Sequence, residues 1–158
     1  MEAQASVSTV FKPSETELQK ALHFLNEEDR ALLKPFLTGA EYPAETMLTN
    51  EGEMGEWMAF VVAGKLAVKK ETNFSGKSIL FAILEEGSMV GEISGLEKGK
   101  RMASVEVVEK CRLLQLSRDN FEILLQEHPY LGIKILKRIV HVVAMRVKKA
   151  DDRLVKLL

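Results

Sequence analysis

The sequence predicts a mainly β domain with helices at both ends. Short β-type runs, separated by turns rich in glycine and asparagine, occupy about residues 38–117. Helical periodicity with capping residues lies before and after this segment. Strands at such spacing are typical of a sandwich or barrel. With 158 residues, 46% of them hydrophobic, the chain can form one domain with its own core.

Two short helices are expected in residues 14–37, after a flexible tail at 1–13 that shows no hydrophobic period. Ser14 and Glu17 form a capping box for the first helix. Asn26 can cap the second helix through its side-chain oxygen.

Gly39 is expected to end the second helix, because glycine is favoured just past a helix C-terminus. The chain then changes to β-type runs, with turns at glycines such as Gly64. The predicted strands are 58–62, 66–70, 78–84, 104–108 and 112–116.

Residues 118–158 are expected to form helices, capped by Ser117 and restarted by Pro129. In the last helix, over 130–158, apolar residues follow alternating steps of three and four, which is a coiled-coil pattern. These residues are Ile133, Leu136, Val140, Val143, Val147, Ala150, Leu154 and Leu157. The helix would extend about 43 Å, longer than a small β domain covers. Its first half is expected to pack on its own domain and its second half on a second copy; the alternative is a core helix throughout.

The strongest chemical signal lies in residues 87–105, which hold four glycines. Glycines let backbone N–H groups converge on an anion, and the N-terminus of a following short helix adds further donors. Arg101 offers a planar, permanently charged fork that suits a phosphate. Glu92 accepts hydrogen bonds when ionised and suits a sugar hydroxyl. An acceptor for ribose beside donors for phosphate predicts a nucleotide pocket.

These residues resemble the phosphate-binding cassette of the cyclic nucleotide-binding domains. That family includes the catabolite activator protein, protein kinase A regulatory subunits and gated ion channels. Its cassette reads roughly Phe-Gly-Glu-aliphatic-small-Leu, a gap, then Pro-Arg-Ala-Ala-Ser/Thr. This chain has Val-Gly-Glu-Ile-Ser-Gly at 90–95 and Lys-Arg-Met-Ala-Ser at 100–104, and so departs from the pattern at Val90, Gly95 and Lys100. The likeness extends over about residues 32–158.

The resemblance implies a double-stranded β-helix, that is, a jelly-roll-like β-roll, over 38–117 with the cassette at 87–105. It also implies a non-catalytic regulatory sensor that binds cAMP or cGMP and holds no tightly bound cofactor. The implied phosphate-binding residues are Arg101, Ser94, Met102 and Ser104. The implied ribose-binding residues are Gly91, Glu92 and Ile93, and Asp151 is the candidate for the base.

The resemblance further implies a parallel homodimer whose last helix, over 130–158, covers the base and relays ligand binding. The implied interface residues are Leu136, Val140, Val143, Val147, Ala150, Leu154 and Leu157. Relatives of the catabolite activator continue into a DNA-binding helix-turn-helix, whereas this sequence stops at Leu158. We therefore expect no direct DNA binding by this chain. Either it is a stand-alone sensor that relays nucleotide levels to a protein effector, or it is a fragment of a longer protein.

Other functional classes lack their residues. His23, His128 and His141 all lie outside the predicted β segment, so a metal-binding cupin lacks its ligands, and no enzyme is expected. A single cysteine, Cys111, fits a reducing cytoplasm, and no apolar run reaches the length of a membrane span. The alternative is a degenerate member of the fold that serves as a dimeric scaffold or senses another anionic ligand.

Overall fold

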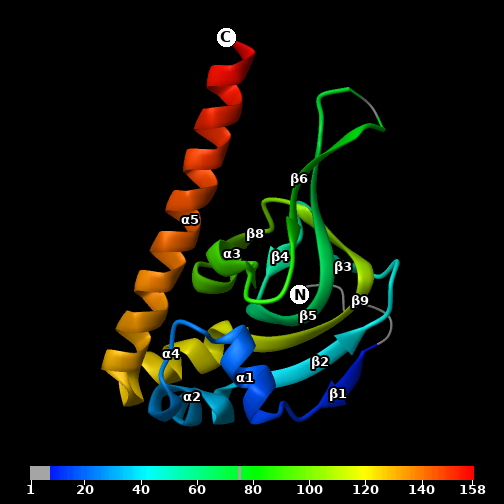
Figure 1. Cartoon of the computed structure of the whole chain (residues 1–158). Helices are drawn as coiled ribbons and strands as arrows, with labels where there is room; N and C mark the ends of the chain where they lie inside the picture. The colour runs from blue at the N-terminus through cyan, green and yellow to red at the C-terminus, as the bar shows by residue number, and fades with distance from the viewer. Residues whose placement is uncertain (1–7, 75) are drawn as a thin grey trace.

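The computed structural model describes residues 8–74 and 76–158 (Figure 1). It is a mainly antiparallel β domain flanked by helices, as the sequence predicts. The strands are β1 (Thr9–Phe11), β2 (Thr38–Tyr42), β3 (Met47–Thr49), β4 (Met54–Gly55), β5 (Trp57–Glu71), β6 (Ser78–Leu84), β7 (Met89–Val90), β8 (Gly99–Lys100) and β9 (Ser104–Ser117). The helices are α1 (Glu15–Ala21), α2 (Glu27–Leu33), the 3₁₀ turn η1 (Lys34–Phe36), α3 (Glu92–Leu96), α4 (Arg118–Glu127) and α5 (Pro129–Leu157).

The sheet is built around two long strands, β5 and β9, which pair antiparallel with each other. The strand order in the sheet is β1-β2-β9-β5-β6. The sequence predicts four shorter strands here, with a turn at Gly64. Instead Gly64, at φ +95°, lies inside β5 where the register with β9 shifts. A Cβ there would lie 2.3 Å from the Lys110 carbonyl oxygen. Gly64 therefore forms a bulge that bends a continuous strand.

The N-terminal segment also differs from the prediction. Residues 1–7 of the expected tail lie outside the described residues, but Thr9–Phe11 forms β1 and pairs with β2. Gly39 belongs to β2, where a Cβ would lie 2.4 Å from the Phe11 carbonyl oxygen, and α2 ends earlier, at Leu33. Gly39 is therefore needed for the close approach of two strands, not to end a helix.

The predicted caps are present. The Ser14 hydroxyl accepts from the Glu17 amide at 3.1 Å, and the Glu17 carboxylate accepts from the Ser14 amide at 3.1 Å. Asn26 caps α2 at its N-terminus, and Ser117 caps α4. Pro129 begins α5, where its missing N–H costs nothing. Local side-chain chemistry therefore sets where these four helices start.

Arg112 on β9 ties α1 to the sheet. It donates to the two Glu17 carboxylate oxygens at 2.7 and 3.1 Å and also to the Glu41 carboxylate. Its guanidinium lies 3.7 Å from the centroid of the Phe11 ring. The hydrogen bond from Arg112 lowers the pKa of Glu17 below its ordinary value.

Alternate residues of the long strands bury two clusters on opposite faces of the sheet. Phe60 faces the helices and joins the cluster that contains Phe121 of α4 and Ile135 of α5. Val61 and Leu113 face the other way and fill the interior of the β fold. The helical layer is thus attached directly to the strands that carry the cassette.

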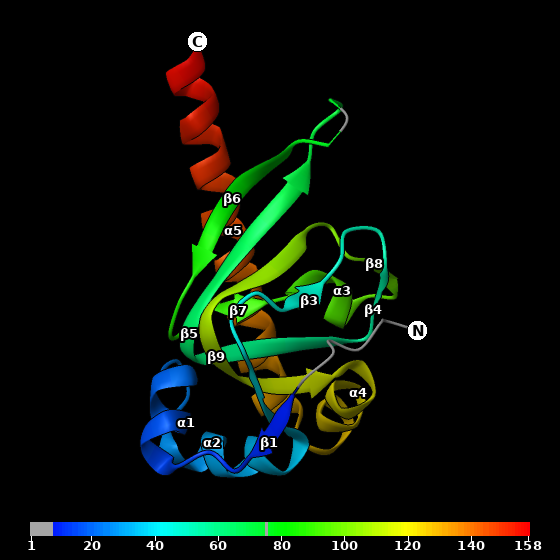
Figure 2. The same ribbon diagram turned by 90° about the vertical axis from the view of Figure 1, so that its right-hand side faces the viewer.

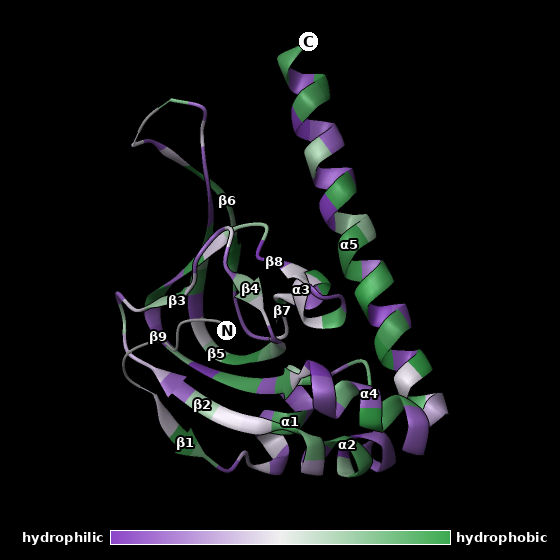
Figure 3. Ribbon diagram, turned by 180° about the vertical axis from the view of Figure 1, so that it is seen from behind, coloured by the Kyte–Doolittle hydropathy of each residue, from purple (hydrophilic) through white to green (hydrophobic). Residues whose placement is uncertain are grey.

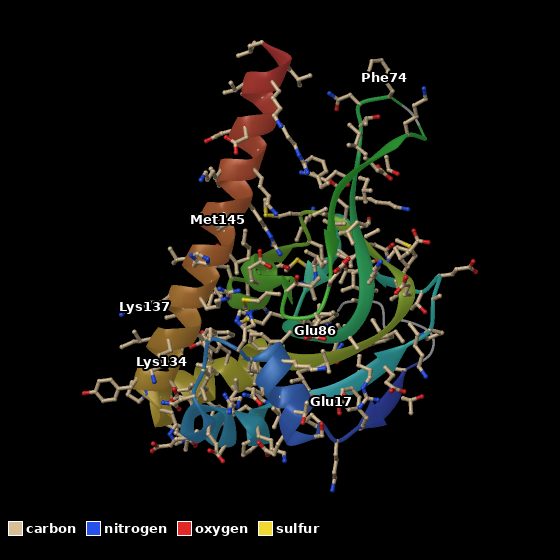
Figure 4. All side chains as sticks on the ribbon, viewed as in Figure 1. Glu17, Phe74, Glu86, Lys134, Lys137 and Met145 are labelled. Carbon is tan, nitrogen blue, oxygen red and sulfur yellow. The ribbon has the colours of Figure 1, made fainter. Side chains whose placement is uncertain are left out.

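The second half of α5 extends beyond this core. Val142 and Val143 still pack against the helical cluster, and the following turns run alongside the distal β5–β6 hairpin (Figures 1 and 2). We call this hairpin, residues 66–84, the arm; Phe74 stands at its tip (Figure 4). Green and purple alternate along the projecting half of α5, so apolar and polar residues are both represented there (Figure 3). Across the described residues, no helix is both long and apolar enough to span a membrane.

Candidate functional site

The cassette folds around the short helix α3, which packs directly on β5. Gly91 caps α3 in a left-handed conformation, at φ +71°, and a Cβ there would lie 2.2 Å from Arg101 Nη1. A Cβ at Gly95 would lie 2.7 Å from the Met58 amide nitrogen. Gly95 departs from the family pattern, and here its lack of a side chain lets the helix rest on the strand backbone.

Arg101 lies beneath α3 and is only 3% exposed. Its Nη1 donates to the Ser94 hydroxyl at 2.8 Å and to the Gly91 carbonyl at 3.3 Å, and its Nη2 donates to the Trp57 carbonyl at 2.9 Å. The guanidinium also lies 4.7 Å from the centroid of the Trp57 ring. The charge expected to bind a phosphate is therefore present, oriented by the cassette and by the start of β5.

Glu92, the first residue of α3, is also 3% exposed, and it pairs with Arg146 of α5. Arg146 donates through Nη1 to a Glu92 carboxylate oxygen and through Nη2 to the Met89 carbonyl at 2.8 Å. Sequence reasoning missed Arg146, because nothing distinguishes it from the other basic residues of the helix. The pair links the expected ribose acceptor to the C-terminal helix.

The remaining predicted ligand residues lie in different settings. Ser94 is buried beside Arg101, whereas Ile93 and Met102 are exposed. The Ser104 hydroxyl accepts from the Glu51 amide at 2.9 Å and so joins β9 to the preceding loop. Asp151 is exposed on α5, and no hydrogen bond joins its carboxylate to a described cassette residue.

The predicted interface residues of α5 divide into two groups. Leu136 and Val143 pack partly against the core of their own domain. The others project outward with Ala150, and the largest exposed side chains among them are Val140, Val147, Leu154 and Leu157. Together with Ile133, three of these form a stripe at seven-residue spacing, with 46%, 67%, 55% and 58% of Ile133, Val140, Val147 and Leu154 exposed. Apolar residues at seven-residue spacing are the pattern found along the contact face of coiled-coil helices.

The potential metal ligands and the single cysteine were located among the described residues. No group of three or more potential ligands among His, Cys, Asp and Glu occurs within residues 8–74 and 76–158. The Cys111 side chain is fully buried, and this burial raises the pKa of its thiol to about 11. A thiol in that environment is unreactive at neutral pH.

Comparison with known proteins identifies the family. The family model described as "Cyclic nucleotide-binding domain" matches residues 40–128, more than half of the chain. The chain belongs to this family. Its cassette, α3 with Glu92 and Arg101, lies within the matched residues.

Individual relatives agree with this assignment. The cyclic AMP receptor protein of Thermus thermophilus is 28% identical over 129 residues, which is 82% of this chain and 57% of that protein. The potassium/sodium hyperpolarization-activated cyclic nucleotide-gated channel 2 of Mus musculus is 39% identical over 82 residues, 52% of this chain and 9% of the channel. The chain thus spans little more than half of its receptor-type relative.

Solved structures show the same fold. A cyclic nucleotide-binding domain from Methylobacillus flagellatus superposes with a TM-score of 0.87 at 21% identity, covering 96% of this chain and 89% of that one. The catabolite activator protein of Thermus thermophilus gives a TM-score of 0.72 at 28% identity, covering 89% of this chain and 62% of that one.

Proposed function

We propose that this chain is a non-catalytic sensor that binds cAMP or cGMP and relays the binding through α5. The observation that carries the proposal is the burial of a carboxylate and a guanidinium, Glu92 and Arg101, against one short helix. In this proposal Arg101 pairs with the cyclic phosphate, and the Glu92 carboxylate accepts a ribose hydroxyl. The ligand is recognised and no bond is broken.

The other residues have supporting roles in the proposal. The amide of Ser94 lies near the N-terminus of α3, where backbone donors lack intrahelical partners and favour an anion. The exposed Met102 would offer its amide to the phosphate, and Ser104 would steady the loop behind it. Gly91 and Ile93 would border the ribose, and Asp151 would accept from the base once α5 moves toward the pocket.

The relay depends on the contact between Glu92 and Arg146. A ribose hydroxyl needs the same carboxylate that Arg146 now holds, so ligand binding and the position of α5 depend on one side chain. A ligand that changes this contact shifts an equilibrium between helix positions. Such coupling typically amounts to about 1–3 kcal/mol.

We further propose that α5 pairs with a second copy in a parallel homodimer, with a protein effector as downstream partner. The seven-residue stripe supports this, because its apolar side chains are exposed on α5. A second copy of the helix packed along the stripe would bury them. Val140→Glu should convert a dimer to a monomer in sedimentation experiments. Lys149→Glu, on the opposite side of the helix, is the matched control and should leave the dimer intact.

The proposed function is tested by titration calorimetry with cAMP and cGMP. The parent chain should bind one of them, and Arg101→Ala should bind at least 30-fold more weakly, because truncating a buried charged partner costs about 2–5 kcal/mol. Lys100→Ala, an exposed neighbouring cation, is the control and should change the affinity less than twofold. A folded parent that binds neither nucleotide would reject the proposal.

One observation favours the alternative, a scaffold or a sensor of another anionic ligand. Both charged groups of the cassette already contact protein atoms, Arg101 through carbonyl oxygens and Glu92 through Arg146. A pocket that has lost its nucleotide could keep these contacts for stability. The titration separates the two functions, since only the sensor responds to a cyclic nucleotide.

A further inference from the structure

Arg118, the first residue of α4, contacts backbone carbonyls of the cassette. Its backbone amide donates to the Glu56 carbonyl at 2.9 Å. Its Nη2 donates to three carbonyl oxygens, those of Gly55, of Ser94 at 2.6 Å and of Glu97 at 3.0 Å. Two of the three lie at the C-terminal end of α3, where unpaired carbonyls and the negative end of the helix dipole favour a cation.

Ser94 is held on two sides by arginines. Its hydroxyl accepts from Arg101 at 2.8 Å, and its carbonyl accepts from Arg118 at 2.6 Å. The backbone of Gly55 packs closely against Ser94, because a Cβ at Gly55 would lie 2.7 Å from the Ser94 side chain. A shift of Arg118 would therefore displace Ser94, whose hydroxyl orients the Arg101 guanidinium.

A helix of five residues depends on such contacts. One turn is too short to be stable on its own, so tertiary contacts must fix the position of α3. Its N-terminal residue, Glu92, is held by Arg146 of α5, and its C-terminal carbonyls are held by Arg118 of α4. The two C-terminal helices, α4 and α5, thus each contact one end of α3.

We infer that Arg118 is a positioning residue of the anion site: it contacts no ligand and fixes α3 so that Ser94 and Arg101 are correctly placed for the phosphate. This inference rests on the proposed function. Through Arg118, α4 would therefore contact the cassette directly, while its Phe121 and Leu124 belong to the same core cluster as Ile135 of α5.

The test compares two arginines with similar numbers of contacts. Arg118→Ala should weaken binding of the cyclic nucleotide at least 10-fold and speed hydrogen–deuterium exchange in residues 92–97. Arg112→Ala, which removes the contacts to Glu17 of α1 and Glu41 of β2 and none to the cassette, should lower stability by a similar amount and leave the affinity within twofold. Arg118→Lys keeps the charge but not the guanidinium geometry, so it should recover about threefold of the lost affinity and still bind at least threefold more weakly than the parent. This variant also serves if the alanine variant fails to fold.

The outcomes separate this inference from the proposed function. If the parent binds and Arg118→Ala or Arg118→Lys binds equally well, the positioning role is overturned and the sensor remains. The role is also overturned if Arg118→Ala and Arg112→Ala lose affinity equally, because general destabilisation then explains the loss. If the folded parent binds neither cAMP nor cGMP, the proposed function fails and this inference fails with it.

Discussion

Replacing Arg146 with alanine is expected to free the second half of α5. Arg146 donates to the buried Glu92 carboxylate and to the Met89 carbonyl at 2.8 Å. A hydrogen bond to a charged group contributes about 1.5–3 kcal/mol, and the 41% exposure of the Arg146 side chain brings the expected loss toward the lower end. We therefore expect a loss of about 1–2 kcal/mol, which corresponds to an increase of about 5- to 30-fold in local opening.

Hydrogen–deuterium exchange of residues 147–157 measures this opening. Arg153→Ala is the matched control, because Arg153 lies two turns further along the same side of α5 and donates to the Phe81 carbonyl at 3.0 Å instead of to the cassette. Losing that exposed hydrogen bond to a neutral acceptor should cost about 1 kcal/mol and affect the last turns only. Glu92→Gln, which keeps the shape of the side chain, should reproduce much of the Arg146→Ala effect.

A double-mutant cycle decides whether the two side chains act together. If Arg146→Ala and Glu92→Gln add to within about 0.5 kcal/mol in the double variant, they are not coupled, and the reasoning that makes α5 the relay is refuted. Unchanged exchange in Arg146→Ala would refute it as well.

Three further predictions concern stability in denaturant titrations. Gly95→Ala should destabilise the protein by about 1–3 kcal/mol because its Cβ meets the β5 backbone, whereas Gly99→Ala, with only one neighbour near 4.0 Å, should have little effect; equal losses would contradict the packing argument. Glu17→Gln should destabilise the protein at pH 7, and the difference in stability between parent and variant should vanish well below pH 4.5. Arg112 lowers the pKa of the Glu17 carboxyl, so its contribution to stability is lost as the pH falls through that pKa. A difference that does not depend on pH would contradict this. The buried Cys111 thiol should make the stability of the protein fall between about pH 9 and about pH 11, by up to about 1.4 kcal/mol per pH unit, because only the thiol of the unfolded chain ionises in that range. Cys111→Ala should remove this part of the pH dependence. An unchanged slope in the variant would contradict the prediction.

The sequence revealed the parts of the fold that depend on local chemistry. The capping box of α1 and the side-chain caps of α2 and α4 follow from residues a few positions apart, and the structure confirms them. Gly64 was misleading because a turn and a bulge both favour positive φ at glycine. β1 escaped notice because three residues are too few to show an alternating pattern.

The same division applies to the site. Glu92 and Arg101 could be proposed because they lie nine residues apart in one glycine-rich stretch. Arg118 and Arg146 could not, because their acceptors are mostly backbone carbonyls far away in the sequence, and basic residues on a helix are normally exposed. Which cations reach the cassette is decided by the packing of α4 and α5, which the sequence pattern does not specify.

The burial of Cys111 has a practical consequence. A thiol with a pKa of about 11 and no exposed surface escapes maleimide reagents at neutral pH, so the native chain already behaves as a cysteine-free background for labelling. Phe74→Cys at the arm tip would carry the only accessible thiol of the described residues. A fluorophore attached there would place a probe at the tip of the arm without any change to the core.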